Sequence, residues 1–214
     1  MGKCILIGAG DLTYDTLSVD KDDFVIAVDG GYAWCKKLQI VPDLIVGDLD
    51  SLTCEMREEI EAAALADPEK LIRLPCEKDD TDMLFALKQG LGKGYLDFIL
   101  YGALGGRLEH TIANIQCLQF LKAQGASGII SDRKASVFLL QNETIRFPKE
   151  KEGFFSLFAL QKQALGVTIE GMKYPLNDAV VTDDFPIGVS NEFVGEESRV
   201  TVRDGTLLAI ISEK

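Results

Sequence analysis

The hydrophobic pattern of this chain changes near residue 135, and this change limits the possible folds more than any other feature. Before it, short apolar runs alternate with segments whose apolar residues recur at helical spacing. Such alternation predicts an α/β domain with a doubly wound, mostly parallel sheet, in which ligands bind where the strands end. The expected strands are residues 3–7, 24–28, 44–46, 71–74, 98–101 and 128–131, and the expected helices are residues 32–38, 54–65, 83–91 and 111–122.

After residue 135 the helical period is absent, and short β-type runs follow one another with Gly and Pro between them. This pattern predicts a small all-β, sandwich or barrel-like C-terminal domain. The Asp204-Gly205 pair favours a tight hairpin between the last two expected strands. We therefore expect two domains, residues 1–134 and 135–214. The expected strands of the second domain are residues 136–140, 144–147, 154–159, 167–170, 199–203 and 206–211.

The charge balance excludes several partners. The 214 residues are 47% hydrophobic, which supports a substantial core, and 22 basic residues stand against 34 acidic ones for a net charge of −12. A surface this acidic is unsuited to binding nucleic acid or an anionic membrane. An acidic protein that handles phosphates needs a cation between the two, so a phosphate-transfer function would depend on a metal.

Histidine and cysteine usage removes further classes. His110 is the single histidine, which excludes His-rich zinc sites. The five cysteines form no C-x-x-C motif, and their odd number fits reduced thiols in a cytoplasmic protein. The first apolar run is too short for a signal peptide, and no later run reaches membrane-spanning length. We expect a cytoplasmic protein.

Glycines follow the first two expected strands. Gly8-Ala9-Gly10 begins like a dinucleotide fingerprint but lacks its third glycine, and the sequence contains no P-loop motif. A tight turn and a phosphate contact both remain open for these glycines. Asp29-Gly30-Gly31 permits close approach of a ligand or forms an ordinary strand-to-helix turn. A nucleotide would have to be held by other groups.

Two aspartates, Asp48 and Asp50, follow the expected strand 44–46. In extended geometry residues two apart face the same way, so these carboxylates are expected to converge on one hard cation. The alternative is a solvated acidic turn, and Asp-x-Asp alone favours that reading.

The segment Lys78-Asp79-Asp80-Thr81-Asp82 lies between an expected strand and an expected helix. Asp80 or Thr81 is expected to cap the helix. Capping does not explain three aspartates within four residues beside a lysine. If both acidic clusters lie at one end of the same sheet, they form a multi-carboxylate cup suited to Mg²⁺ on phosphate oxygens, and Lys78 adds a positive charge.

A third cluster follows the expected strand 98–101. Glycines such as Gly105 and Gly106 let backbone N–H groups approach an anion, and Arg107 is suited to bind phosphate. His110 and Asn114 are four residues apart and share one helical face. A lone histidine is more often structural than catalytic.

The motifs occur in the order seen in thiamine pyrophosphokinases, and the chain resembles that family over almost its whole length. The motifs of the first domain are Asp29-Gly30-Gly31, Gly47-Asp48-x-Asp50-Ser51, Lys78-Asp79-x-Thr81-Asp82 and Gly105-Gly106-Arg107-x-x-His110-x-x-x-Asn114. Those of the second domain are Gly171-Met172-Lys173-Tyr174-Pro175-Leu176 and Ser190-Asn191-Glu192.

The resemblance implies transfer of a pyrophosphoryl group from the co-substrate ATP to the hydroxyethyl group of thiamine, which gives thiamine diphosphate and AMP, with Mg²⁺ as cofactor. It implies a catalytic, ATP- and Mg²⁺-binding domain at residues 1–134 and a thiamine-binding domain at residues 135–214. It also implies a homodimer with sites between protomers.

The resemblance assigns residues as well. Metal binding and catalysis are implied for Asp48, Asp50, Asp79 and Asp82, with Arg107 as a further catalytic residue. ATP binding is implied for Asp29, Gly30, Gly31, Lys78, Arg107, His110 and Asn114, and thiamine binding for Tyr174, Ser190 and Asn191. The chain departs from the family pattern at Glu109, where Asp is common, and at Tyr174, where some relatives have Trp. Asp80 stands at a position that varies in the family, so the resemblance implies a helix cap as its first role and a ligand as its second.

We expect in-line attack of the thiamine hydroxyl on the β-phosphorus of ATP, driven by positioning and charge neutralisation. Two other functions remain open. One is a metal-dependent phosphohydrolase or ordinary kinase, which would release phosphate or ADP instead of AMP. The other is a non-catalytic sensor of thiamine or a nucleotide, which would bind without turnover.

Overall fold

A computed structural model describes residues 2–75 and 79–214 of the chain. The chain divides into two compact units, Met1–Arg133 and Lys134–Lys214, and each is described by itself. None of the described helices combines the length and apolar character needed to cross a membrane.

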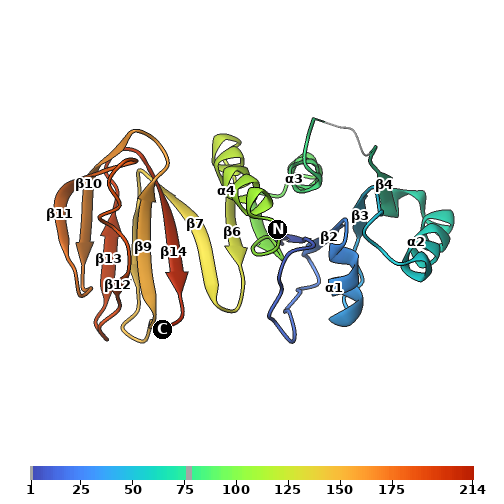
Figure 1. Cartoon of the computed structure of the whole chain (residues 1–214), viewed down its shortest axis with the longest axis horizontal. Helices are drawn as coiled ribbons and strands as arrows, with labels where there is room; N and C mark the ends of the chain where they lie inside the picture. The colour runs from blue at the N-terminus through green and yellow to red at the C-terminus, as the bar shows by residue number, and fades with distance from the viewer. Residues whose placement is uncertain (1, 76–78) are drawn as a thin grey trace. The chain divides into compact units, whose positions relative to one another are not determined.

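The first unit contains a parallel sheet with the strand order β6-β5-β1-β2-β3-β4. Its strands are β1 (Cys4–Ile7), β2 (Phe24–Val28), β3 (Leu44–Gly47), β4 (Leu71–Arg73), β5 (Asp97–Tyr101) and β6 (Ser127–Ser131). The helices are α1 (Gly31–Lys37), α2 (Cys54–Ala66), α3 (Asp82–Gly92) and α4 (Leu108–Ala123), with a short 3₁₀ helix, η1 (Pro68–Lys70), before β4. Figure 1 shows α1 below and α3 above the central strands, as a doubly wound sheet requires.

Burial on both faces explains why these strands read as continuous apolar runs. All four residues of β1 and of β3 are buried, because helices cover both sides of the sheet. Helix α1 packs closely on β1: a Cβ on Gly31 would lie 1.8 Å from the carbonyl oxygen of Ile7. Only glycine allows this approach, which brings the start of α1 directly beside the end of β1.

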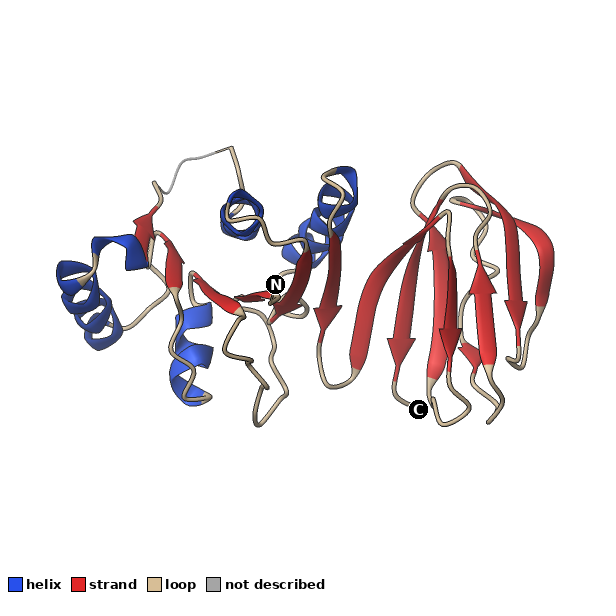
Figure 2. Ribbon diagram, turned by 180° about the vertical axis from the view of Figure 1, so that it is seen from behind, coloured by secondary structure: helices blue, strands red, loops and turns tan. Residues whose placement is uncertain are grey.

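The second unit consists of two antiparallel sheets, with strand orders β12-β9-β14-β7 and β11-β10-β13-β8 (Figure 2). Its strands are β7 (Ala135–Gln141), β8 (Thr144–Phe147), β9 (Phe154–Ala159), β10 (Gln163–Glu170), β11 (Leu176–Thr182), β12 (Asn191–Glu192), β13 (Ser198–Thr201) and β14 (Thr206–Ser212). Inward-facing side chains such as Phe155, Val167 and Leu207 form one core between the sheets.

The predicted fold class, a mostly parallel α/β unit followed by a small β sandwich, is confirmed. The hairpin predicted at Asp204-Gly205 is wrong. β13 pairs with β8 and β10, whereas β14 pairs with β7 and β9, so the turn carries the chain from one sheet to the other. Gly205 has a φ of 111° and exchanges hydrogen bonds with Asn142, at 2.8 and 3.3 Å. The Asp-Gly pair therefore serves a crossing between sheets.

Candidate active site

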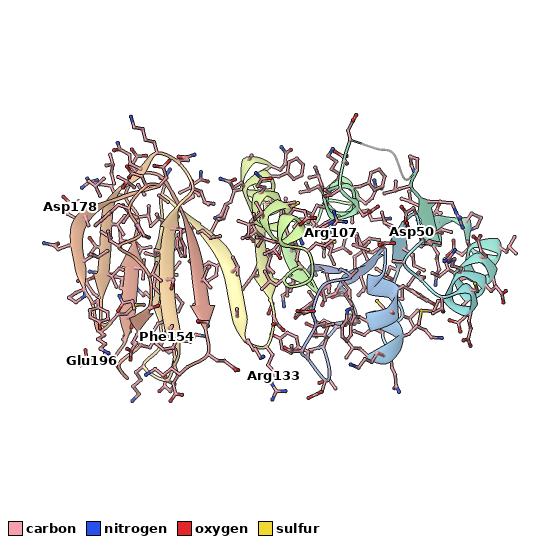
Figure 3. The ribbon with its side chains drawn as sticks, viewed as in Figure 1. Asp50, Arg107, Arg133, Phe154, Asp178 and Glu196 are labelled. Carbon is pink, nitrogen blue, oxygen red and sulfur yellow. The ribbon has the colours of Figure 1, made fainter. Side chains whose placement is uncertain are left out.

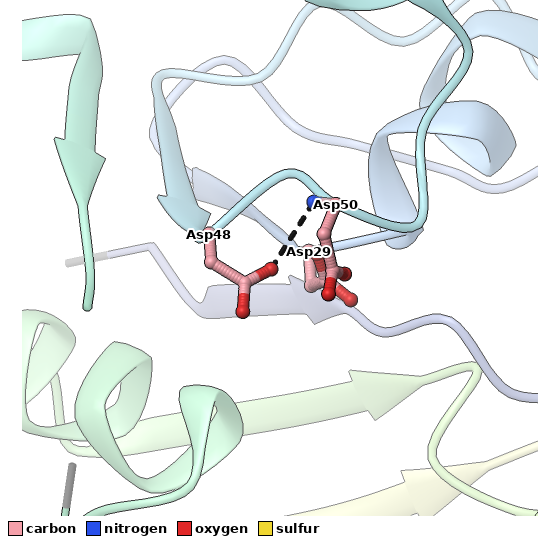
Figure 4. Close-up of side chains that lie close together, drawn as sticks. All are labelled: Asp29, Asp48 and Asp50. Carbon is pink, nitrogen blue, oxygen red and sulfur yellow. Dashed lines mark hydrogen bonds between the residues drawn. The ribbon is translucent and has the colours of Figure 1, made fainter. Parts of the chain in front are cut away.

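Three carboxylates gather where two neighbouring strands end. Asp29 follows β2, and Asp48 and Asp50 follow β3; one oxygen from each lies within 4.8 Å of the others (Figure 4). The register explains the meeting, because Val28 pairs with Val46 in the parallel ladder. Among the described residues the structure thus forms one compact acidic cluster of Asp29, Asp48 and Asp50, here called the carboxylate cluster.

The backbone between Asp48 and Asp50 is a turn, so the predicted extended geometry is wrong. Leu49 has a φ of 66° and buries its side chain almost completely. The amide of Asp50 donates a hydrogen bond of 3.1 Å to Oδ1 of Asp48. The two carboxylates converge because Leu49 is fixed in the core while the chain turns around it.

The electrostatics of the carboxylate cluster suit a hard cation. Hydrogen bonding with Asp48 and repulsion from it raise the pKa of Asp50 above its ordinary value, and burial and Asp29 add to this. Oδ2 of Asp29 accepts a hydrogen bond of 3.0 Å from the Ser51 hydroxyl. Its Oδ1 is buried and has no hydrogen-bond partner in the described part of the chain. Crowded carboxylate oxygens with an unsatisfied buried acceptor fit Mg²⁺.

A cavity of about 510 Å³ lies beside the carboxylate cluster, within the first unit. Its walls come from the ends of β1, β2 and β5 and from the starts of α3 and α4. Asp50 and Arg107 reach it from loops that follow different strands (Figure 3). Of the predicted site residues, the cavity is lined by Asp29, Asp50, Asp82, Arg107, His110 and Asn114.

Other predicted residues do not line this cavity. Gly30, Gly31, Asp48 and Asp79 are not among its lining residues, and Lys78 lies outside the described residues. Gly31 is required for packing of α1 on β1. Asp79 is exposed, and neither Asp79 nor Asp82 belongs to the carboxylate cluster.

At the start of α3, one residue caps the helix and another lines the cavity. The Thr81 hydroxyl caps the helix by accepting a hydrogen bond of 3.2 Å from the Leu84 amide. Asp80 is not the cap, because its carboxylate pairs with Lys88 at 2.6 Å. Asp82 is the first residue of α3 and lines the cavity.

The loop between β5 and α4 forms another wall. Arg107 precedes the first residue of α4; its side chain is 73% exposed, and its Nε donates a hydrogen bond of 2.7 Å to Glu109. The backbone amide of Glu109 itself, and after it this contact with Arg107, lower the pKa of Glu109. Asn114 is buried and donates a hydrogen bond of 2.8 Å to the Ala103 carbonyl, so it supports the loop. His110 is exposed at the cavity.

The second unit presents Tyr174 on its surface. This side chain is 57% exposed, and Nζ of Lys173 lies 5.4 Å from the centre of its ring. Asn191 is buried: its Oδ1 accepts from the Tyr174 amide at 2.9 Å, and its Nδ2 donates to the Tyr174 carbonyl at 2.7 Å. Ser190 is exposed, with a φ of 59°. Asn191 therefore holds the backbone that carries the exposed ring.

Comparison with known proteins identifies both units. A family model described as the catalytic domain of thiamin pyrophosphokinase matches residues 16–129, and one described as its vitamin B1 binding domain matches residues 142–207. The chain belongs to the thiamine pyrophosphokinase family. This confirms the resemblance drawn from the motifs and the prediction of an enzyme, a thiamine pyrophosphokinase.

Individual members of the family match most or all of this chain in sequence or in structure. The Bacillus subtilis enzyme is 30% identical over 201 residues, which cover 90% of this chain and 89% of the relative. A crystal structure of thiamine pyrophosphokinase from the same organism covers 99% of this chain and all of its own, with a TM-score of 0.86 at 27% identity. A family protein from Enterococcus faecalis has a TM-score of 0.81 at 26% identity, with both chains fully covered.

The predicted sets omitted several cavity residues. Ser51 bonds to Asp29 and lines the cavity, and its place directly after Asp48-x-Asp50 was the available signal. Thr81 and Met83 flank Asp82 in the wall. Asp29 was assigned to the nucleotide alone, although it belongs to the carboxylate cluster. No sequence signal placed Asp29 beside Asp48 and Asp50, because their meeting depends on β2 and β3 being adjacent in the sheet.

Proposed function

We propose that this thiamine pyrophosphokinase transfers the pyrophosphoryl group of ATP to the hydroxyethyl oxygen of thiamine, giving thiamine diphosphate and AMP. The observation that carries the proposal is the carboxylate cluster at the edge of a cavity large enough for a nucleotide polyphosphate. The remaining cavity wall offers loop amides, a helix start and an arginine, which are the groups that bind phosphates.

Asp29, Asp48 and Asp50 are the proposed holders of Mg²⁺, since their oxygens already lie within 4.8 Å of one another. When bound, the metal would neutralise phosphate charge that a chain of net charge −12 would otherwise repel. Asp82 lines the same cavity and is proposed as a further metal ligand or as the acceptor of the thiamine hydroxyl proton. Asp79 is also proposed as a metal ligand, in a supporting place beside α3.

Arg107 is proposed to bind the phosphates of ATP. Its Nε contacts Glu109, which leaves the two Nη groups to form a bidentate contact with phosphate oxygens. The proposed ATP-binding set also contains His110, which lines the cavity beside Arg107, and Lys78. Gly30, Gly31 and Asn114 are proposed to act indirectly, through the backbone that they allow or support.

Thiamine is proposed to bind through Tyr174 and Ser190 of the second unit. An exposed aromatic ring suits a cationic aromatic vitamin, because the ring face attracts positive charge. Asn191 is proposed to act by fixing Tyr174. We further propose a cytoplasmic homodimer; the exposed apolar side chains Phe185, Ile187 and Val189 support a contact between copies.

The proposal is tested by neutralising the carboxylate cluster. Asp48→Asn or Asp29→Asn should lower kcat at saturating Mg²⁺ by at least about 100-fold, the scale on which single electrostatic groups act in transfer reactions. Asp22→Asn, the same change on the loop before β2, is the matched control and should retain wild-type turnover. If Asp48→Asn and Asp29→Asn retain near-normal turnover while AMP still appears with thiamine diphosphate, the assigned metal site is wrong.

A further inference from the structure

The single tryptophan of the chain contacts the backbone of the cavity wall. Trp34 lies on α1, and its indole N–H donates a hydrogen bond of 3.0 Å to the carbonyl oxygen of Gly10. Gly10 lines the cavity together with Gly8 and Ala9, and these three residues are here called the β1 wall. Trp34 itself is not among the lining residues, so its hydrogen bond reaches the cavity indirectly, through the Gly10 carbonyl.

The β1 wall is bonded on its opposite side to the loop that follows β5. The Gly10 amide donates to the carbonyl of Gly102 at 2.8 Å, and the Asp11 amide donates to the carbonyl of Leu104 at the same distance. A Cβ on Gly10 would lie 2.4 Å from the Leu104 carbonyl oxygen, so the two backbones are in close contact. Gly10 therefore bonds through its N–H to one cavity loop and through its C=O to Trp34.

Helix α1 connects this contact to the carboxylate cluster. The helix starts at Gly31, two residues after Asp29, and Gly31 packs on the backbone at the end of β1. A Cβ on Gly30 would lie 3.0 Å from Cβ of Ala9. The bond from Trp34 to Gly10 thus joins helix α1, which begins two residues after Asp29 of the carboxylate cluster, to the β1 wall.

The indole ring has a separate packing role. It is partly buried against the core of the first unit, and Nζ of Lys37 lies 4.6 Å from the centre of its ring. A phenyl ring could provide most of this packing but has no N–H to donate. The hydrogen bond and the packing of Trp34 are therefore separable by substitution.

We propose that Trp34 is a positioning residue for ATP, whose indole N–H fixes the Gly10 carbonyl and so holds the β1 wall in its binding geometry. The inference rests on the proposed function, which places ATP in this cavity. Because the β1 wall is already fixed before ATP binds, binding loses less conformational entropy of the wall, and the hydrogen bond contributes to ATP affinity. The thiamine-contacting groups of the second unit are unaffected.

The test compares two replacements of Trp34 with a matched control. Trp34→Phe removes the donor and part of the ring, whereas β-(3-benzothienyl)alanine, incorporated at this single tryptophan position, replaces only the N–H with sulfur. Lys37→Met removes the cation over the same ring and keeps the N–H. ATP affinity is measured by calorimetry with Mg²⁺, and KM and kcat with both substrates.

Both replacements should weaken ATP binding about fivefold, the value of one neutral hydrogen bond, with kcat and the KM for thiamine unchanged. Lys37→Met should bind ATP as the wild type does. Wild-type ATP affinity in the benzothienyl protein overturns the inference, as does equal weakening in Lys37→Met. If the wild type binds no ATP, the proposed function is wrong and so is the inference. If the wild type binds ATP and the replacements change only the melting temperature, the inference alone is wrong.

Discussion

Replacing Asn191 with alanine should destabilise the second unit and loosen its exposed ring. The side chain is 5% exposed; its Oδ1 accepts from the amides of Tyr174 and Glu192, both at 2.9 Å, and its Nδ2 donates to the Tyr174 carbonyl at 2.7 Å. Three hydrogen bonds at about 1 kcal/mol each give a loss of about 3 kcal/mol. For a chain of this length that corresponds to a fall in melting temperature of about 6–12 °C.

Scanning calorimetry measures the stability change, and steady-state kinetics measure its effect on the site. We expect the KM for thiamine to rise in Asn191→Ala while the KM for ATP stays unchanged, because Tyr174 is the group that Asn191 holds. Asn177→Ala is the matched control: Asn177 is exposed on β11 and should lose less than about 0.5 kcal/mol. An Asn191→Ala protein within about 1 kcal/mol of the wild type would refute the hydrogen-bond account.

Two further predictions concern the first unit. Of the described cysteines only Cys54 is exposed, and burial raises the pKa of Cys35 to about 12. At pH 8 a Cys76→Ser protein should therefore react rapidly with a thiol reagent at one site, Cys54. Rapid labelling of Cys35 would contradict its burial. Gly31→Ala forces a Cβ to within 1.8 Å of a carbonyl oxygen and should lower the free energy of unfolding in urea by about 3 kcal/mol or prevent folding. Gly92→Ala, whose Cβ would have nothing within 4 Å, should raise it by about 0.5 kcal/mol. Equal effects of the two substitutions would contradict the packing of α1 on β1.

Much of the fold was predictable because periodicity is a local property. Strands such as β2 (Phe24–Val28) were predicted with their observed bounds, since a buried parallel strand is apolar at every position. Strand β11 was missed, because Asn177 and Asp178 interrupt its apolar pattern and its ladder with β10 is irregular. The hairpin at Asp204-Gly205 was wrong because turn residues do not determine which strands pair.

The site was only partly predictable, because its membership depends on strand order. Asp48 and Asp50 were recognised from their spacing, but their partner Asp29 follows a strand that precedes them by one helix. Asp79 and Asp82 follow β4, an edge strand of the first unit's sheet, and lie outside the carboxylate cluster. Asn114 and Asn191 were recognised from the motifs, but their role in holding backbone was not, because it depends on contacts that only the folded chain brings together.

Attack of the thiamine hydroxyl on the β-phosphorus of ATP determines which bond of ATP breaks, and oxygen isotopes report that bond. ATP carrying ¹⁸O in the bridge between the α- and β-phosphates is turned over with thiamine and Mg²⁺, and both products are analysed by mass spectrometry. Attack at the β-phosphorus breaks its bond to the bridge, so AMP should carry the label and form in equal amount with unlabelled thiamine diphosphate. Formation of ADP, or AMP without the bridge label, would rule out attack at the β-phosphorus.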